Sequence, residues 1–155
     1  MSAWRRFGAG WLALLLGLAA AAPALAATPV TIAVISLDGD PRHAPRRMEK
    51  GYPGHPAGRA VEGLMLAAQD SAVELDSIGL ALSVKDVVLP NAAALDRTLA
   101  ALKAAKVQHL VADLPAAELR ALVQAAPAAL GGAIVFNAAQ EDDDLRGAGC
   151  GGRIL

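Results

Sequence analysis

The residues best placed for ligand chemistry are a carboxylate and an amide, each at the end of an apolar run of strand length. Asp113 follows residues 107–112, and Asn137 ends residues 132–137. If both runs are parallel strands, their carboxyl ends meet at one edge of the sheet, where loops on a rigid scaffold carry function. There the Asp113 carboxylate could contact an amine or hydroxyl group of a ligand. The predicted ligand-binding residues are Asp113, Leu114, Pro115, Asn137, Ala138 and Ala139.

Both polar residues also have a structural interpretation, and the sequence leaves the two interpretations open. Asp113 lies just before Pro115, which fits the first turn of a helix, and a carboxylate near a helix N-terminus is stabilising. Asn137 could simply end its strand, because asparagine is disfavoured inside strands. Residues 36–40, which follow the first apolar run, complete the same predicted edge.

Patterns typical of catalysis, metal binding and nucleotide binding do not occur in the sequence. Residues 37–41 follow the first apolar run without the glycine-rich turn that cradles phosphates. His43, His55 and His109 lack metal-ligand spacing, and the acidic residues 141–144 form a run typical of a solvated surface. Because no catalytic triad or nucleophile elbow occurs either, we predict a non-enzymatic protein with no catalytic residue, no metal and no cofactor.

The order of the predicted elements defines the fold class. Apolar runs of strand length alternate with segments of helical period, which indicates an α/β fold with a parallel sheet. Residues 80–89 alternate apolar with polar or small side chains, the pattern of a half-exposed edge strand. We therefore predict a doubly wound parallel sheet with the strand order 2-1-3-4. The predicted strands are residues 30–37, 80–89, 107–112 and 132–137, and the predicted helices are residues 57–75, 91–106 and 115–127.

The first predicted helix carries a clear apolar stripe and follows a long loop. The loop, residues 38–58, exceeds the usual connection between a strand and a helix, which indicates either function or disorder. The stripe of the first helix consists of Val61, Leu64, Met65, Ala68, Ala72 and Leu75.

The second helix is predicted to be capped by Asn91.

The first 26 residues have the three regions of a cleavable secretory signal peptide. Two arginines precede the apolar residues 11–22, and the small-residue site 24–26 follows. The apolar run is shorter than the roughly 20 residues that span a bilayer, so a retained membrane anchor is less favoured. We predict cleavage between Ala26 and Ala27, export to the periplasm, and a folded domain over residues 27–155.

The charge and composition of the exported part limit its partners and its core. Loss of the two N-terminal arginines leaves 12 basic and 15 acidic groups, a net charge of −3. This mild acidic excess provides no basic surface for nucleic acid or anionic lipid. Aromatic residues make up only 3% of the sequence, so the core must consist of aliphatic side chains and alanine. The lone cysteine, Cys150, cannot form an internal disulfide.

Five short sequences resemble those of a known family: IAVI at 32–35, GRAVEG at 58–63, LVADLPA at 110–116, FNA at 136–138 and DDLRG at 143–147. With the signal peptide, the first two of them resemble the start of type I periplasmic substrate-binding proteins, the branched-chain amino acid class of ABC transporters. The later three resemble more narrowly the subgroup linked to pyrroloquinoline-quinone-dependent alcohol dehydrogenase systems.

The resemblance implies an incomplete N-terminal lobe of a two-lobed protein that closes on a small-molecule ligand and delivers it to an ABC permease in the inner membrane. The implied function is a periplasmic solute-binding component tied to quinoprotein alcohol oxidation, with quinoprotein dehydrogenase components as further partners. Members of the class offer small hydroxyl residues after the third and fourth strands, where this chain has Asp113 and Asn137, so an amino-acid ligand is not expected. The alternative is a non-transport accessory or interaction protein of a quinoprotein dehydrogenase system.

Overall fold

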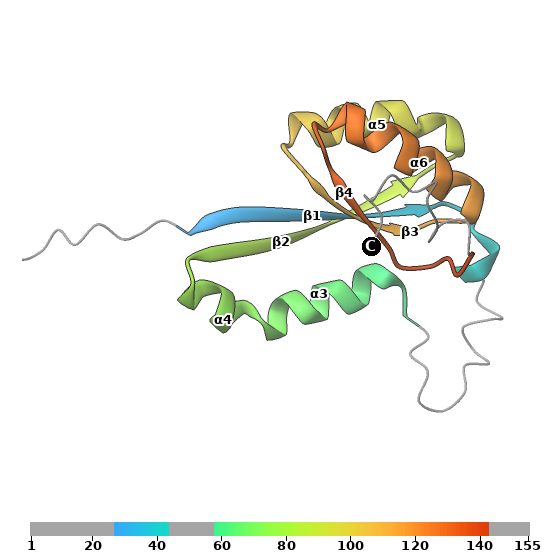
Figure 1. Ribbon diagram of the computed structural model, residues 1–155. Coiled ribbons are helices and arrows are strands. Elements are labelled where there is room, and N and C mark those ends of the chain that lie inside the picture. The colour runs from blue at the N-terminus through green and yellow to red at the C-terminus, as the bar shows by residue number, and fades with distance from the viewer. Residues whose placement is uncertain (1–26, 44–57, 143–155) are drawn as a thin grey trace, which may run out of the picture.

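A computed structural model describes residues 27–43 and 58–142, which form a four-stranded, all-parallel sheet with helices on both faces (Figure 1). The sheet order is β2-β1-β3-β4, so the predicted α/β class and strand order are confirmed, with the alternating strand at an edge. The strands are β1 (Thr28–Leu37), β2 (Leu80–Leu89), β3 (His109–Asp113) and β4 (Ile134–Asn137). The helices are α3 (Ala60–Asp70), α4 (Ala72–Ser77), α5 (Leu95–Ala104) and α6 (Ala116–Ala129), with 3₁₀ turns η2 (Pro41–His43) and η3 (Ala92–Ala94).

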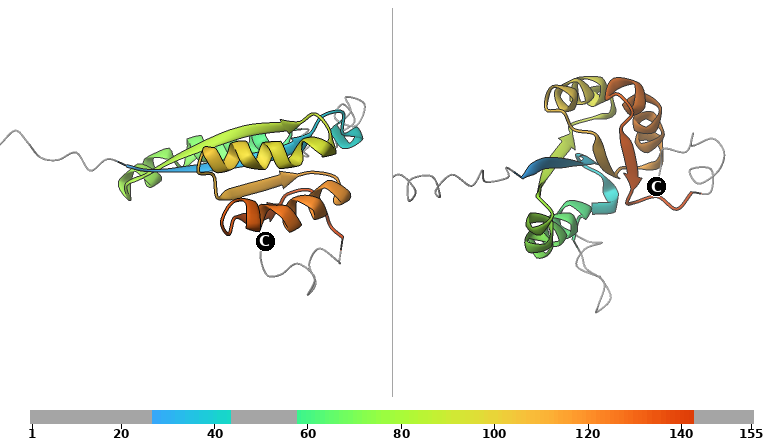
Figure 2. Two further views of the ribbon diagram at one scale, coloured as in Figure 1. Left: turned by 90° about the horizontal axis from the view of Figure 1, so that it is seen from above. Right: turned by 60° about the vertical axis from the view of Figure 1, so that its left-hand side comes forward.

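The helices form two layers that sandwich the sheet. Figure 2 shows α3 and α4 on one face and α5 and α6 on the other. The chain leaves β1 for β2 on one side, then crosses back through α5 to β3 on the other side. The strand order therefore reverses between β1 and β3, and this switch point is where open α/β sheets bind ligands, at the carboxyl ends of the strands.

The main core lies between the sheet and the layer formed by α5 and α6. It is built from aliphatic side chains and alanine, as the composition predicts. Strand residues on alternate positions point into it, and they meet the apolar stripes of the two helices. The buried residues of this core include Ala33, Ile35, Leu110, Ala112 and Val135 from the strands and Leu99, Leu102, Leu119, Leu122 and Ala126 from the helices.

The first predicted helix differs from its prediction in two ways. It is broken at Ser71, whose ψ of 4° ends α3, so that α4 is a separate short helix. The predicted stripe is also too wide: Met65 is 46% exposed and Ala72 is exposed as well, whereas Val61 is buried. These helices pack mainly against β2 at the sheet edge, where only a narrow part of each helix surface can be covered.

The ends of the other helices fall close to their predicted positions. Asn91 occupies the N-cap position of η3 and makes no side-chain capping hydrogen bond, so its predicted capping contact is absent. The helix proper, α5, then begins at Leu95. Pro115 lies at the N-cap of α6 rather than inside its first turn, and Pro127 lies within the last turn, as the helix extends to Ala129.

The C-terminus of α5 ends in a left-handed residue that is not glycine. Lys106 has φ 57°, while Gly79 and Gly131 occupy the same position after α4 and α6 with φ of 73° and 71°. The Lys106 N–H donates to the carbonyl of Lys103 (2.9 Å), and the Val107 N–H donates to that of Leu102 (3.0 Å). These two bonds are the Schellman pattern, which glycine satisfies without a clash between Cβ and the backbone.

We expect Lys106→Gly to raise the free energy of unfolding by about 0.5–1 kcal/mol, because it removes the left-handed strain of a residue with a Cβ. Lys103→Gly, in the last helical turn, is the matched control and should lower stability by about 1 kcal/mol. Urea unfolding followed by circular dichroism measures both changes. A loss of stability in Lys106→Gly would contradict the assignment of strain to this residue.

Candidate functional site

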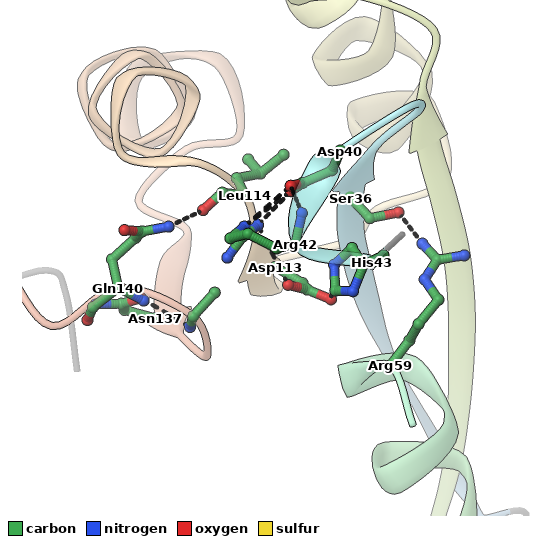
Figure 3. A network of polar contacts seen from close by, with 10 residues as sticks. Ser36, Asp40, Arg42, His43, Arg59, Asp113, Leu114, Asn137 and Gln140 are labelled. Atoms are coloured by element: carbon green, nitrogen blue, oxygen red, sulfur yellow. Dashed lines mark hydrogen bonds and ion pairs between the residues drawn. The ribbon is translucent and has the colours of Figure 1, made fainter. Parts of the chain in front are cut away.

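The buried polar side chains of the described residues gather at the carboxyl edge of the sheet. Ser36, Asp40 and Asp113 are 1%, 5% and 4% exposed, whereas the other buried side chains in residues 27–43 and 58–142 are apolar. Ser36 pairs with Asp113 in the register of β1 and β3, so both lie at the switch point. Figure 3 shows the polar network around them. Burial of polar groups is costly unless they are bonded, so each of these residues requires partners.

A charged cluster, defined here as Asp40, Arg42, His43 and Asp113, joins the loop after β1 to the end of β3. Arg42 Nε donates to Oδ2 of Asp40 at 2.9 Å, and Arg42 Nη2 reaches Oδ1 of Asp113 at 3.5 Å. The backbone N–H of Arg42 also donates to Oδ1 of Asp40 at 2.9 Å. One guanidinium group therefore holds two buried carboxylates, and it fixes the turn η2 above the strand ends.

His43 adds a second contact to Asp113. Its Nε2 lies 3.1 Å from Oδ2 of Asp113 but lacks the angle of a hydrogen bond, and this nitrogen is buried without a hydrogen-bond partner among the described residues. The contact is therefore electrostatic when the imidazole is protonated. Arg42 and His43 thus lie against the two oxygens of the Asp113 carboxylate.

The environment of Asp40 shifts its pKa. Burial alone raises the pKa of this carboxyl, because the charged form loses hydration. The hydrogen bonds from the Arg42 side chain and backbone, together with the positive charges of Arg42 and His43, outweigh burial and hold the pKa below its ordinary value of 3.8. The folded protein therefore binds fewer protons at Asp40 than the unfolded chain does in acid.

This shift predicts a loss of stability in acid. Because the folded pKa is depressed, the contribution of Asp40 is present above about pH 4 and is lost as the pH falls through the folded value. Asp40→Asn cannot titrate, so its free energy of unfolding should depend less steeply on pH between about 5 and 3 than that of the unmodified protein. Urea unfolding at a series of pH values compares the two. Parallel pH profiles would show that Asp40 has no depressed pKa.

A second polar contact lies beside the cluster, on the α3 side. Arg59, at the N-cap of α3, extends its side chain to the end of β1, and its Nη2 donates to Oγ of Ser36 (Figure 3). The backbone N–H of Arg59 donates to Oε2 of Glu62 at 3.0 Å. Arg59 Nε is buried and has no hydrogen-bond partner among residues 27–43 and 58–142.

An open hollow of about 410 Å³ lies between the end of β1, β2 and the start of α3. Three aliphatic side chains line the hollow together with charged side chains and the imidazole of a histidine. A hollow of this size, with an apolar wall and a few polar groups, is suited to a small organic ligand. The lining residues are Leu37, Asp38, Gly39, Asp40, Pro41, His43, Arg59 and Val88.

Asp113 lies at the predicted edge but does not serve as a helix cap. The N-cap of α6 is Pro115, and no side chain caps this helix. The Asp113 carboxylate is instead directed to Arg42 and His43. The alternative capping interpretation of Asp113 is therefore wrong, because its oxygens contact Arg42 and His43 from the loop after β1 instead.

Asn137 uses its side chain within its own loop. Its Oδ1 accepts from the backbone N–H groups of Ala139 and Gln140, at 3.1 and 2.9 Å, and its Nδ2 donates to the Gln140 carbonyl at 2.7 Å. Gln140 Nε2 in turn donates to the Leu114 carbonyl at 2.7 Å, which links this loop to the end of β3. None of the six predicted ligand-binding residues lines the hollow, although Asp113 contacts its wall through His43.

Sequence reasoning named the strand ends but missed the cations beside them. Arg42, His43 and Arg59 fall in or next to the long loop after β1. The available signal was the position of this loop, since a loop after the first strand must start at the carboxyl edge. The turn η2 determines which charged residues of this loop lie against the sheet. No sequence motif predicts this turn.

The remaining predictions concern the acidic run, metal binding, the membrane and residues outside the described part of the chain. Asp142, from the acidic run, forms an exposed ion pair with Arg120 at 3.4 Å. Within residues 27–43 and 58–142, no group of histidine, cysteine or acidic side chains could hold a metal ion, and no helix is long and apolar enough to cross a bilayer. The predicted signal peptide, His55 and Cys150 lie outside the described residues.

Fold and site together define a doubly wound parallel α/β domain with a charged cluster at its switch point and a small hollow beside it, between the ends of β1 and β2. Comparison of the chain with family models, with curated proteins and with solved structures finds no match.

Proposed function

We propose that this chain is the ligand-binding lobe of an exported, non-enzymatic solute-binding protein that serves an ABC permease, in a system for quinoprotein alcohol oxidation. The observation that carries the proposal is the convergence of Ser36, Asp40 and Asp113, the buried polar side chains of the described residues, on the carboxyl edge at the switch point. This edge is the usual ligand site of such sheets. The sequence resemblance supports the transporter class, and the N-terminal signal pattern supports export to the periplasm.

The open shape of the hollow fits a lobe better than a complete binding site. A small ligand binds tightly when most of its surface is covered, and a hollow open to solvent covers only part of it. In the proposed protein a second lobe would cover the remainder by hinge closure. We therefore expect weak binding to this chain alone.

The chemistry of the site favours binding over catalysis. The His43 and Asp113 pair would need a nucleophile next to the imidazole to act as a hydrolytic dyad. The nearby hydroxyl group of Ser36 accepts from Arg59 instead, and no contact joins it to His43 among the described residues. The buried carboxylates are likewise held by cations, which suits a fixed, preorganised surface.

A ligand screen tests the proposal. The protein is heated with alcohols, short-chain acids, amino acids and pyrroloquinoline quinone, and the melting temperature is compared with that of the free protein. A true ligand at about 100 times its dissociation constant should add about 2.7 kcal/mol to the free energy of unfolding. The backbone amide NMR signals of residues 37–40 should then shift, while those of α6, on the opposite face, should not.

The negative result is also informative. If the protein melts cooperatively and no compound of any class raises the melting temperature, the solute-binding proposal fails. An accessory role within a quinoprotein dehydrogenase system would then be favoured, because such a role requires a partner protein and no small ligand.

A further inference from the structure

We infer that Arg59, positioned by Ser36, binds the carboxylate group of a small organic acid in the hollow at the end of β1. This inference rests on the proposed function, since it names the ligand class of the same site. The starting observation is the position of the Arg59 guanidinium group, which extends from the start of α3 to the end of β1 and lines the hollow (Figure 3).

The charged side chains that line the hollow are the carboxylates of Asp38 and Asp40 and the guanidinium group of Arg59, and Arg59 is the cation among them. Asp40 and Asp113 are each held by Arg42, and His43 lies against Asp113. The Arg59 guanidinium group, in contrast, contacts the uncharged hydroxyl of Ser36 and forms no ion pair among residues 27–43 and 58–142, while the Glu62 carboxylate accepts from the Arg59 backbone N–H. A half-buried guanidinium group without an anion is poorly compensated, so an anionic ligand would bind there with a charge-assisted hydrogen bond.

The hydrogen-bonding groups beside Arg59 are donors. Ser36 is 1% exposed, and its Oγ accepts from Arg59 Nη2, so its hydroxyl hydrogen is left without an acceptor among the described residues. Arg59 Nε is a further donor without a partner there. The Arg59 guanidinium group, which lines the hollow, has only donors and therefore selects a group that only accepts hydrogen bonds; an ionised carboxylate is such a group.

The shape of the site favours a carboxylate on a short aliphatic chain. The planar fork of a guanidinium group matches the two oxygens of a carboxylate. The aliphatic side chains of Leu37, Pro41 and Val88 also line the hollow and can pack against a few methylene groups. The positive end of the α3 dipole lies at Arg59 and adds to the attraction.

Calorimetric titration with matched acids and alcohols tests this inference. Acetate, propionate and butyrate are titrated into the protein, and ethanol, propanol and butanol serve as probes of the same chain length without the charge. The acids should bind saturably and the alcohols should not. Arg59→Gln should weaken acid binding about tenfold or more, because a charged hydrogen-bond donor is lost. Arg97→Gln removes the same charge from an exposed position on α5 and should leave binding unchanged.

The outcomes separate this inference from the proposed function. If alcohols or other neutral compounds bind, and Arg59→Gln binds every ligand as the unmodified protein does, the carboxylate inference is overturned while solute binding stands. If no compound binds, both fail. Should Arg59→Gln not fold, the Nε–Hε NMR signal of Arg59 in the unmodified protein decides: a saturable shift with propionate supports the inference, and a constant signal overturns it.

Discussion

Arg42→Ala is expected to lower the free energy of unfolding by about 3 kcal/mol, because it leaves two buried carboxylates without their shared cation. Asp40 would lose the side-chain bonds from Arg42 Nε and Nη2, and Asp113 would keep only the contact from His43. A carboxylate that is more than 90% buried cannot recover this loss through hydration. Urea unfolding followed by circular dichroism at neutral pH measures the change.

Two further variants control this experiment. Arg42→Lys retains the positive charge but loses the planar fork, so its loss of stability should be smaller than that of Arg42→Ala. Arg97→Ala removes an exposed arginine and should change stability by no more than about 0.5 kcal/mol. A loss below about 1 kcal/mol in Arg42→Ala would mean that the charged cluster contributes little to the fold.

Leu110→Ala is expected to destabilise the protein by about 3–4 kcal/mol. Leu110 is fully buried in β3, which lies between β1 and β4, and its side chain is part of the main core. The substitution removes apolar surface from the core and leaves a cavity that the neighbouring strands cannot close.

Leu66→Ala is the matched control for this change, since the same atoms are removed from a side chain that is 59% exposed on α3. It should alter the free energy of unfolding by about 0.5 kcal/mol or less. Equal losses in the two variants would contradict the assignment of the core to the face covered by α5 and α6. The midpoint and slope of urea unfolding should be compared for both.

The fold could be predicted because its signals are local. The alternation in residues 80–89 marked the edge strand, and three crossovers then allowed few arrangements of the sheet. Local patterns failed where backbone geometry decided the result. Ser71 breaks the first helix although neither glycine nor proline marks the position, and Lys106 adopts a conformation that is typical of glycine.

The candidate site was less predictable because its contacts are distant in sequence. Arg42 and Asp113 are 71 positions apart, and the turn η2 brings them together. Sequence reasoning placed Asp113 at the correct edge, since strand ends follow from apolar runs. It could not assign Arg59 to Ser36, because that contact depends on the angle at which α3 packs along the sheet.

The pairing of β1 with β3 also sets when the charged cluster can form during folding. Its members come from the loop after the first strand and from the end of the third, and parallel strand pairs of this kind close late because of the chain entropy of a long loop. During synthesis, Asp40 and Arg42 leave the ribosome before Asp113 does. At that stage the cluster lacks the Asp113 carboxylate. The complete cluster therefore marks the pairing of β1 with β3, and its contacts to Asp113 can stabilise only chains that have already passed that stage.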